Sequence, residues 1–204
     1  MITLHHLRVG RSIFTVWLLE EVAVDYQLEV YHREESMRAP ESLKQIHPLG
    51  KSPVIDDDGL VLSESGAITT YILNKYDTDN KFGVSDDSDA AYAEMLQWIA
   101  YSEGSVFAPL LMKMFLLRSA IEHPVMTPFS EGEFKLHFDH IANKLGQSDY
   151  ILGDRLSGAD FGIAFVTSMA AGLGLLVDYP TLLAYIERIQ SRDAYKRAIE
   201  KAVE

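Results

Sequence analysis

The pattern of hydrophobic residues changes once along the chain, and this change limits the folds open to it. Residues 1–78 alternate between short strand-like runs and helical periodicity, whereas the segments after residue 90 all have helical periodicity. Interleaved strands and helices indicate an α/β unit, and helices without strands indicate an all-α unit. The sequence therefore predicts an α/β domain at 1–78, a linker at 79–89 and an all-helical C-terminal domain at 90–204.

Local features predict the order of elements in the first domain. Strand-like runs before and after a helix that Ser12 can cap indicate a βαβ unit. Two further short strands are joined by Asp-Asp-Asp-Gly at 56–59, which is a strong hairpin pattern. Ser63 or Ser65 then begins a helix. The predicted order is βαβ followed by ββα.

Individual residues mark the linker and the helix boundaries of the helical domain. Five aspartates fall within 77–89, and Asp86 and Asp87 are expected to be solvated. Pro109 lies inside a long helical pattern and predicts a kink or break. Ser157 and Asp160 have the spacing of a capping box at the start of a helix.

Charge and composition exclude several classes of protein. The chain has 18 Lys and Arg against 30 Asp and Glu, a formal net charge of −12. Such a surface repels phosphate groups, so neither nucleic acid nor an anionic membrane is an expected partner. The absence of cysteine excludes disulfides, thiolate metal sites and a cysteine nucleophile. The N-terminus lacks the pattern of a signal peptide, and a cytoplasmic location is expected.

Glu64 and Ser65 form an acidic–hydroxyl pair where a strand passes into a helix. The unpaired N–H groups and the positive dipole at a helix start suit a carboxylate. The serine hydroxyl adds a donor, and the glutamate can hold an ammonium group. The pair would thus bind the two charged groups of an amino-acid end. The alternative is that Ser65 only caps the helix and Glu64 only favours the dipole.

Lys51, Ser52 and Pro53 lie at the start of the third predicted strand. A proline in a tight turn here can be cis, which would expose the backbone of Ser52 to an extended peptide. Lys51 could then meet a second carboxylate. The alternative is an ordinary trans proline that begins an edge strand, with Lys51 solvated.

Together, these pieces resemble the cytosolic glutathione S-transferase family over nearly the whole chain. The residues that carry the resemblance are Leu-Gly-Lys-Ser-Pro-Val at 49–54, Glu-Ser-Gly-Ala-Ile at 64–68 and the segment at 151–160. Residues 17–21 and 47–53 look like a branch common in bacteria and fungi. The resemblance implies a thioredoxin-like N-terminal domain, a helical C-terminal domain and a two-fold homodimer.

The resemblance also implies roles for individual residues. Glu64 and Ser65 would bind the γ-glutamyl end of glutathione. Ser52, before a cis Pro53, would pair with the backbone of its cysteinyl residue, and Lys51 would lie near its glycyl carboxylate. Glutathione would be a co-substrate, and no resident cofactor or metal is expected.

The residue that activates the thiol is less evident. Family members place a Tyr, Ser or Cys after the first strand, and this branch commonly has a serine at the position of Gly10. Ser12 is the first candidate for the catalytic donor and His6 the second. Their alternatives are a helix cap for Ser12 and a partly buried strand histidine for His6.

Other groups near this turn stay open as donors. They are His5, Arg11, Thr15 and the backbone N–H groups at the helix start. Glu103 would reach the γ-glutamyl amine across a dimer, or it is a solvated helix carboxylate.

Two further sets of residues lie in the helical domain. Glu133, His137 and His140 have spacing that would suit a metal, but they flank an apolar stripe where solvated polar residues are expected. Phe107 and Met112 are candidates for an apolar electrophile pocket, with helical core as the alternative.

The expected function is conjugation of the glutathione thiolate to a hydrophobic electrophile, an activity associated with detoxification. One alternative is a non-catalytic binding or interaction protein of the same fold, which Gly10 favours. The other is glutathione-dependent peroxide reduction, which needs the same thiolate but a different acceptor.

Overall fold

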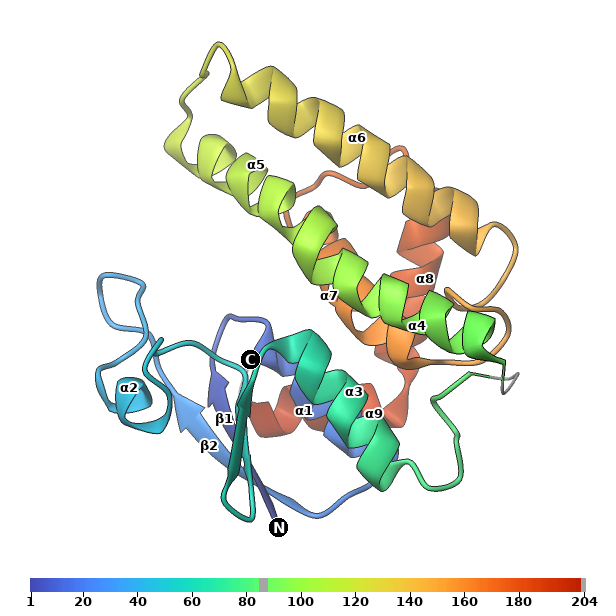
Figure 1. Cartoon of the computed structure of the whole chain (residues 1–204). Helices are drawn as coiled ribbons and strands as arrows, with labels where there is room; N and C mark the ends of the chain where they lie inside the picture. Colours follow the sequence, from blue (N-terminus) through green and yellow to red (C-terminus); the bar gives the residue numbers. More distant parts are fainter. Residues whose placement is uncertain (85–87, 203–204) are drawn as a thin grey trace. The chain divides into compact units, whose positions relative to one another are not determined.

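The computed structural model describes residues 1–84 and 88–202 (Figure 1). It divides into two compact units, one of residues 1–82 with those from 190 onward, and one of residues 83–189. The sequence placed 90–204 together in the helical domain, whereas in the structure the final helix packs with the first unit. Asp86 and Asp87 of the predicted linker lie outside the described residues.

The first unit is built on a mixed four-stranded sheet. Its strands are β1 (Ile2–Leu7), β2 (Tyr26–Tyr31), β3 (Val54–Asp57) and β4 (Leu60–Ser63). Their order is β2-β1-β3-β4, with β1 parallel to β2 and the other neighbours antiparallel (Figure 1). This is the thioredoxin-like arrangement that the family resemblance implies, and its element order is the predicted βαβ followed by ββα.

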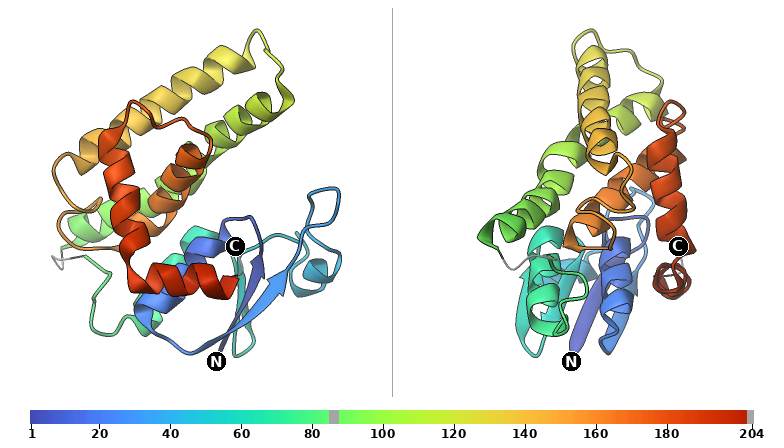
Figure 2. Two further views of the ribbon diagram at one scale, coloured as in Figure 1. Left: turned by 180° about the vertical axis from the view of Figure 1, so that it is seen from behind. Right: turned by 90° about the vertical axis from the view of Figure 1, so that its right-hand side faces the viewer.

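Four helices accompany this sheet: α1 (Ser12–Val22), α2 (Ser42–Ile46), α3 (Ser65–Tyr76) and α9 (Asp193–Ala202). Helices α1 and α3 lie side by side on one face, and α9 packs against α1 (Figure 2). The short helix α2 was not predicted, because five residues are too few to show a helical period.

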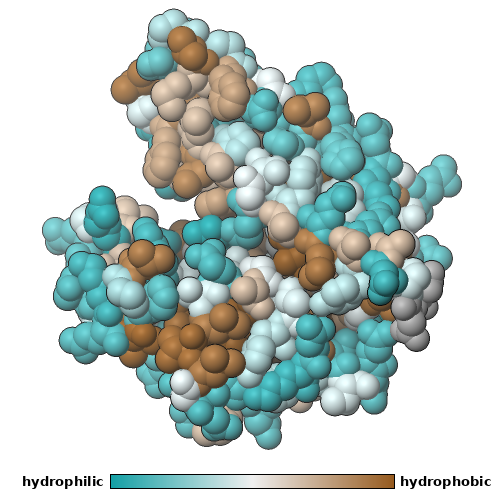
Figure 3. Space-filling model, in the orientation of Figure 1, coloured by the Kyte–Doolittle hydropathy of each residue, from teal (hydrophilic) through white to brown (hydrophobic). Residues whose placement is uncertain are grey.

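The β3–β4 hairpin confirms the sequence prediction. Asp58 and Gly59, the two residues of its loop, have φ of 52° and 94°. Positive φ at both positions is what a type I′ turn requires. On the edge strand β4, Leu60 and Val61 are 46% and 44% exposed, and Figure 3 shows a hydrophobic patch over this strand.

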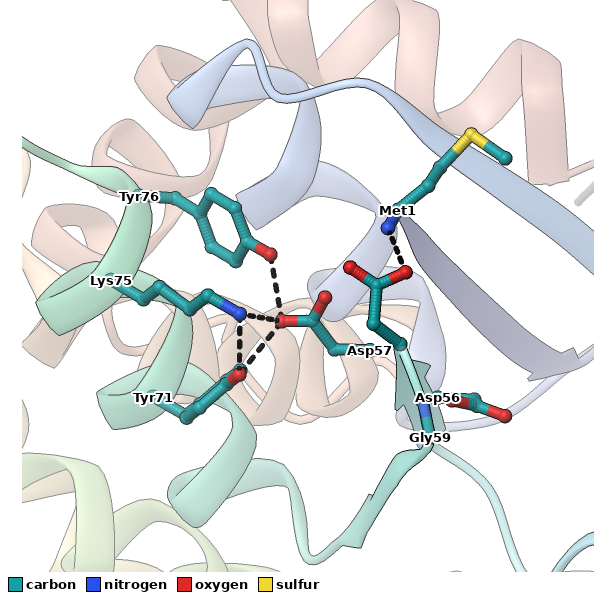
Figure 4. Close-up of polar contacts among 8 residues, drawn as sticks. Met1, Asp56, Asp57, Gly59, Tyr71, Lys75 and Tyr76 are labelled. Atoms are coloured by element: carbon teal, nitrogen blue, oxygen red, sulfur yellow. Dashed lines mark hydrogen bonds and ion pairs between the residues drawn. The ribbon is translucent and has the colours of Figure 1, made fainter.

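A buried carboxylate fastens α3 to the sheet (Figure 4). One oxygen of Asp57, at the end of β3, accepts hydrogen bonds from Tyr71 (2.7 Å), Lys75 (2.6 Å) and Tyr76 (2.7 Å). Burial alone would raise the pKa of Asp57, but these bonds and the charge of Lys75 outweigh it and lower that pKa to about 2. The cluster holds α3 in place and so fixes where the helix begins.

Two acidic residues of α1 bind α9 and the residue directly before it. Glu20 accepts hydrogen bonds from Arg197 (2.9 Å) and Lys201 (2.5 Å). The carboxylate of Glu21 binds Arg192 in a two-pronged contact of 2.5 and 2.8 Å. The side chains of Glu20 and Glu21 are 6% and 5% exposed, so both carboxylates are shielded from solvent.

The second unit is all helical. It contains α4 (Asp89–Tyr101), the π-helical stretch η1 (Ser102–Phe107), α5 (Ala108–Ser119), α6 (Met126–Leu145), α7 (Gly158–Gly172) and most of α8 (Pro180–Ser191). Helices α5 and α6 lie side by side (Figure 1). Pro109 falls in the first turn of α5, directly after η1. The sequence predicted a kink or break here, whereas residues 89–119 form continuous helical backbone in which a π-helical stretch precedes the proline.

The start of α7 confirms the predicted capping box. Ser157 and Asp160 bind each other's backbone N–H groups. The other carboxylate oxygen of Asp160 accepts hydrogen bonds from the backbone N–H of Ile151 (2.9 Å) and the hydroxyl of Tyr185 (3.0 Å). One aspartate therefore joins the start of α7 to the preceding loop and to α8.

Candidate functional site

The register of the sheet brings the two binding motifs together. Val54 pairs with His5 on one side and with Ser63 on the other. The residues before Val54 therefore lie between the end of β1 and the start of α3. The peptide bond between Ser52 and Pro53 is cis, as predicted.

Ser52 joins the start of β3 to the end of β1. Its hydroxyl donates to the carbonyl of His5 (2.7 Å) and accepts from the backbone N–H of Leu7 (3.0 Å). Its side chain thus serves the fold, which leaves the backbone as the part that could bind a ligand. Pro53 beside it is buried, and Lys51 is exposed.

Glu64 and Ser65 form the entrance to α3. Glu64 has φ of 70°, a left-handed conformation that is uncommon for a residue with a side chain, and it is exposed. Ser65 is the first residue of the helix and is 4% exposed. The backbone therefore turns sharply at this junction, and the first N–H groups of α3 lie next to the cis proline.

The structure brings Ser12 and His6 together but buries both. The hydroxyl of Ser12 lies 2.8 Å from Nδ1 of His6 and accepts from the backbone N–H of Leu7 (3.2 Å). Both residues are 0% exposed. Neither can touch a bound thiol unless the turn rearranges, so the structure does not support the direct catalytic role that we expected of them. Ser12 does not cap α1 either, because its hydroxyl turns back onto β1.

The alternative donors differ in their access to solvent. Thr15 is 0% exposed, and His5 is 7% exposed with Nδ1 at 3.0 Å from the hydroxyl of Tyr31. Burial lowers the pKa of His5. Arg11, directly before α1, remains partly exposed. Of the donors named from the sequence, Arg11 and the backbone of the turn are therefore the accessible ones.

Sequence reasoning did not identify Arg33, which lies in the loop after β2. Its guanidinium donates to the carbonyls of Arg8 (Nε, 3.1 Å) and Val9 (Nη2, 2.8 Å) in the turn between β1 and α1. No motif marks this residue, because its partners lie some 24 positions earlier in the chain. The contact becomes visible only when β2 is paired beside β1.

Phe107 and Met112 belong to the second unit. Phe107 ends η1, and its ring centroid lies 6.1 Å from that of Phe165. Met112 lies on α5, and both residues are half-buried. Their proposed role beside an electrophile stays a prediction. Glu103, in η1, is also half-buried.

The three residues considered for a metal enter other contacts. His137 lies 3.3 Å from Glu133 and 2.7 Å from the hydroxyl of Tyr101, and His140 stacks on Trp98 with ring centroids 5.2 Å apart. Across residues 1–84 and 88–202, no group of three His, Cys, Asp or Glu side chains is placed to hold a metal. Among the helices formed by these residues, none has the length and apolar character needed to cross a bilayer.

Family models match both parts of the chain. The N-terminal domain of glutathione S-transferase matches residues 1–74, and the C-terminal domain of glutathione S-transferase matches residues 126–193. Glutathione S-transferase 1 of Saccharomyces cerevisiae is 30% identical, over 99% of this chain and 95% of its own length. Glutathione S-transferase 3 of Schizosaccharomyces pombe is also 30% identical, over 98% and 88%.

Solved structures agree with the sequence relatives. A glutathione S-transferase from Actinobacillus pleuropneumoniae superposes with a TM-score of 0.89 at 37% identity, over 100% of this chain and 93% of its own. A glutathione transferase homologue from Lodderomyces elongisporus, solved with two GSH per subunit, has a TM-score of 0.83 at 20% identity, over 98% of each chain. The second likeness concerns the fold alone. With the sequence relatives, the family models and the site geometry in agreement, the chain belongs to the glutathione S-transferase family.

Proposed function

We propose that this chain binds glutathione at the junction of the cis proline and α3 and conjugates its thiolate to a hydrophobic electrophile. The observation that carries the proposal is the register that places Ser52–Pro53 beside the start of α3. An extended tripeptide can pair with backbone at a strand start, while its carboxylate lies at the positive end of a helix.

Each binding residue has a role in this proposal. Ser65 and the first N–H groups of α3 hold the γ-glutamyl carboxylate, and the exposed Glu64 attracts the ammonium group. The backbone of Ser52 pairs with the cysteinyl residue. Lys51, which is exposed, reaches the glycyl carboxylate. These contacts would give the chain affinity for the tripeptide and would direct its sulfur toward the turn between β1 and α1.

Catalysis would consist of thiolate stabilisation and proximity. A free thiol has a pKa of about 8.5, and lowering it by about two units requires about 2.7 kcal/mol of preferential thiolate stabilisation. The positive groups near the turn include the start of α1 and the partly exposed guanidinium of Arg11. With an aryl halide, the thiolate sulfur bonds to the ring carbon, halide leaves with its electron pair, and the thiol proton passes to solvent. Phe107 and Met112 remain our candidates for contacts to the electrophile.

The same proposal includes the cofactor requirement, the cellular location and the oligomeric state. Glutathione is a co-substrate, no resident cofactor or metal is required, and conjugation would serve detoxification in the cytoplasm. We also propose a homodimer, supported by the exposed apolar residues Leu60 and Val61 on the edge strand β4. Light scattering on purified protein tests this, and a monomeric mass would exclude it.

Turnover assays separate this function from its alternatives. The purified chain is given glutathione with chlorodinitrobenzene and, separately, with cumene hydroperoxide. Conjugation of the aryl halide supports the transferase. Activity with the peroxide alone would favour a peroxidase, and retention on immobilised glutathione without turnover would favour a binding protein, which the glycine at position 10 makes the second candidate.

A further inference from the structure

The turn between β1 and α1 holds a strained residue. Val9 has φ of 55°, a left-handed conformation that is unfavourable for a β-branched side chain. Its side chain cannot be what stabilises this conformation, because Val9 is 64% exposed. Such strain persists only where the surroundings impose it.

Arg33 supplies the restraint. Its three nitrogens donate to three carbonyl oxygens: those of Arg8 (3.1 Å), Val9 (2.8 Å) and Met37 (2.9 Å). The planar guanidinium thus ties two consecutive carbonyls of the turn to its own loop. A lysine, with a single nitrogen, cannot reproduce this fork.

Gly10 leaves room for this arrangement. A Cβ at this position would lie 2.9 Å from the carbonyl oxygen of Leu7 and 3.2 Å from Nη2 of Arg33. A larger residue would require the backbone to shift or the guanidinium to leave its place. The absence of a side chain at position 10 is therefore matched to the position of the Arg33 guanidinium.

We propose that Arg33 is a positioning residue that holds the β1–α1 turn in the form that stabilises the glutathione thiolate. This inference rests on the proposed function. The carbonyls of Arg8 and Val9 belong to the peptide groups that carry the N–H of Val9 and of Gly10. A charge-assisted bond to a carbonyl polarises its peptide group and strengthens its N–H as a donor. The backbone N–H groups of the turn, held by Arg33, thereby become the donors that stabilise the thiolate.

The pKa of the bound thiol is the direct test. It is measured by the ultraviolet absorbance of the thiolate in the glutathione complex of the wild type, Arg33→Ala and Arg33→Lys. We expect both substitutions to raise the thiol pKa by about one unit or more, since each breaks charge-assisted bonds that order the turn. At neutral pH kcat/KM should fall about tenfold, and the deficit should close at a pH where the thiol ionises unaided. Guanidinium ions should partly restore the low pKa in Arg33→Ala.

Controls separate positioning from folding and from binding. Arg38→Ala removes the same charge from an exposed position in the same loop and should leave the thiol pKa unchanged. Affinity for S-methylglutathione, which has no ionisable thiol, should stay within about twofold of wild type in all variants, because its binding groups lie elsewhere. If Arg33→Ala does not fold, the thiol pKa measured in Arg33→Lys, which keeps the charge, tests the proposal.

The results distinguish a failure of the proposed role of Arg33 from a failure of the proposed glutathione transferase function. A wild type that binds no glutathione refutes both. A wild type that binds glutathione with a lowered thiol pKa, and keeps that pKa in the Arg33 variants, refutes only the role of Arg33. A loss of S-methylglutathione affinity equal to the loss of activity would also refute it, because it would show a purely structural effect.

Discussion

Ser12 shows what a single residue type leaves undecided. A serine at a helix start can cap the helix, face a ligand or turn back onto a strand, and the local sequence is the same in each case. In the structure its hydroxyl lies 2.8 Å from Nδ1 of His6, and both residues are fully buried. The pairing depends on how α1 packs on β1, which no spacing within the segment encodes.

The same limit applies to Asp57, whose partners lie 14 to 19 positions along the chain. The sequence marks it as one of three aspartates in a hairpin turn, with nothing to separate it from Asp56 and Asp58. Only the packing of α3 on the sheet shows that Asp57 is the buried one, with 3% exposure.

Replacing Asp57 by asparagine should lower stability in a pH-dependent way. The folded pKa of Asp57 is lowered from 3.8 to about 2, so its contribution is present above about pH 4 and is lost as pH falls through about 2. Solvent screens the half-exposed Lys75, so we expect a loss of about 1 to 2 kcal/mol at neutral pH. Urea unfolding of the wild type and Asp57→Asn, near neutral pH and near pH 2.5, measures this effect. The difference in unfolding free energy between the two proteins should be smaller at the lower pH.

Asp79→Asn removes one charge from an exposed site and should change the unfolding free energy by less than about 0.5 kcal/mol. A difference between wild type and Asp57→Asn that stays constant across this pH range would contradict the assignment.

Elements with strong local patterns were predicted well. The hairpin follows from its turn residues, and the start of α7 follows from its capping spacing. The α/β and all-helical classes of the two parts came from the hydrophobic pattern, whereas the family resemblance implied the thioredoxin-like arrangement and favoured the cis bond before Pro53. Helix α2 was missed because its five residues are stabilised by their surroundings more than by their own pattern.

The capping box of α7 gives a prediction for one element. Ser157→Ala should lower the unfolding free energy by about 1 to 2 kcal/mol, because the first N–H groups of the helix lose their acceptor. Ser157→Thr, which keeps a hydroxyl, should recover most of this loss, and Ser119→Ala at the exposed end of α5 should have little effect. Chemical unfolding followed by circular dichroism measures all three. An alanine variant as stable as the threonine variant would rule out the cap.

At the scale of the whole molecule, the C-terminal segment belongs to the same compact unit as the N-terminal residues, which the sequence did not reveal. Residues 190 onward return to the first unit, where Arg192 and Arg197 meet glutamates 171 and 177 positions earlier. The sequence shows an amphipathic final helix, but its charges do not say which carboxylates they face. The domain boundary predicted at 90–204 fails to separate this helix for that reason.

Glu20→Gln tests how strongly the ion pairs of Glu20 hold α9 in the first unit. Its carboxylate, 6% exposed, accepts from Tyr26, Arg197 and Lys201, and removing the charge leaves the cations on α9 without their counterion. Solvent screens the half-exposed Arg197 and Lys201, so we expect a loss of about 1 to 2 kcal/mol in unfolding free energy. Glu29→Gln on β2, at an exposed position, is the matched control and should cost under about 0.5 kcal/mol. Equal stabilities of the two variants, measured by urea unfolding, would show that α9 is held by other contacts.

Calorimetric titration of glutathione into the wild type, Ser65→Ala and Thr70→Ala tests the central claim most directly. Thr70 lies on α3 and its hydroxyl donates to the carbonyl of Gly66, so its loss perturbs the first turn of the same helix but leaves the Ser65 hydroxyl in place. We predict binding by the wild type and Thr70→Ala, and affinity at least about tenfold weaker in Ser65→Ala, since a hydrogen bond to a charged group is lost. Absence of binding by the wild type at millimolar glutathione, or equal affinity in Ser65→Ala, would contradict a glutathione site at this junction.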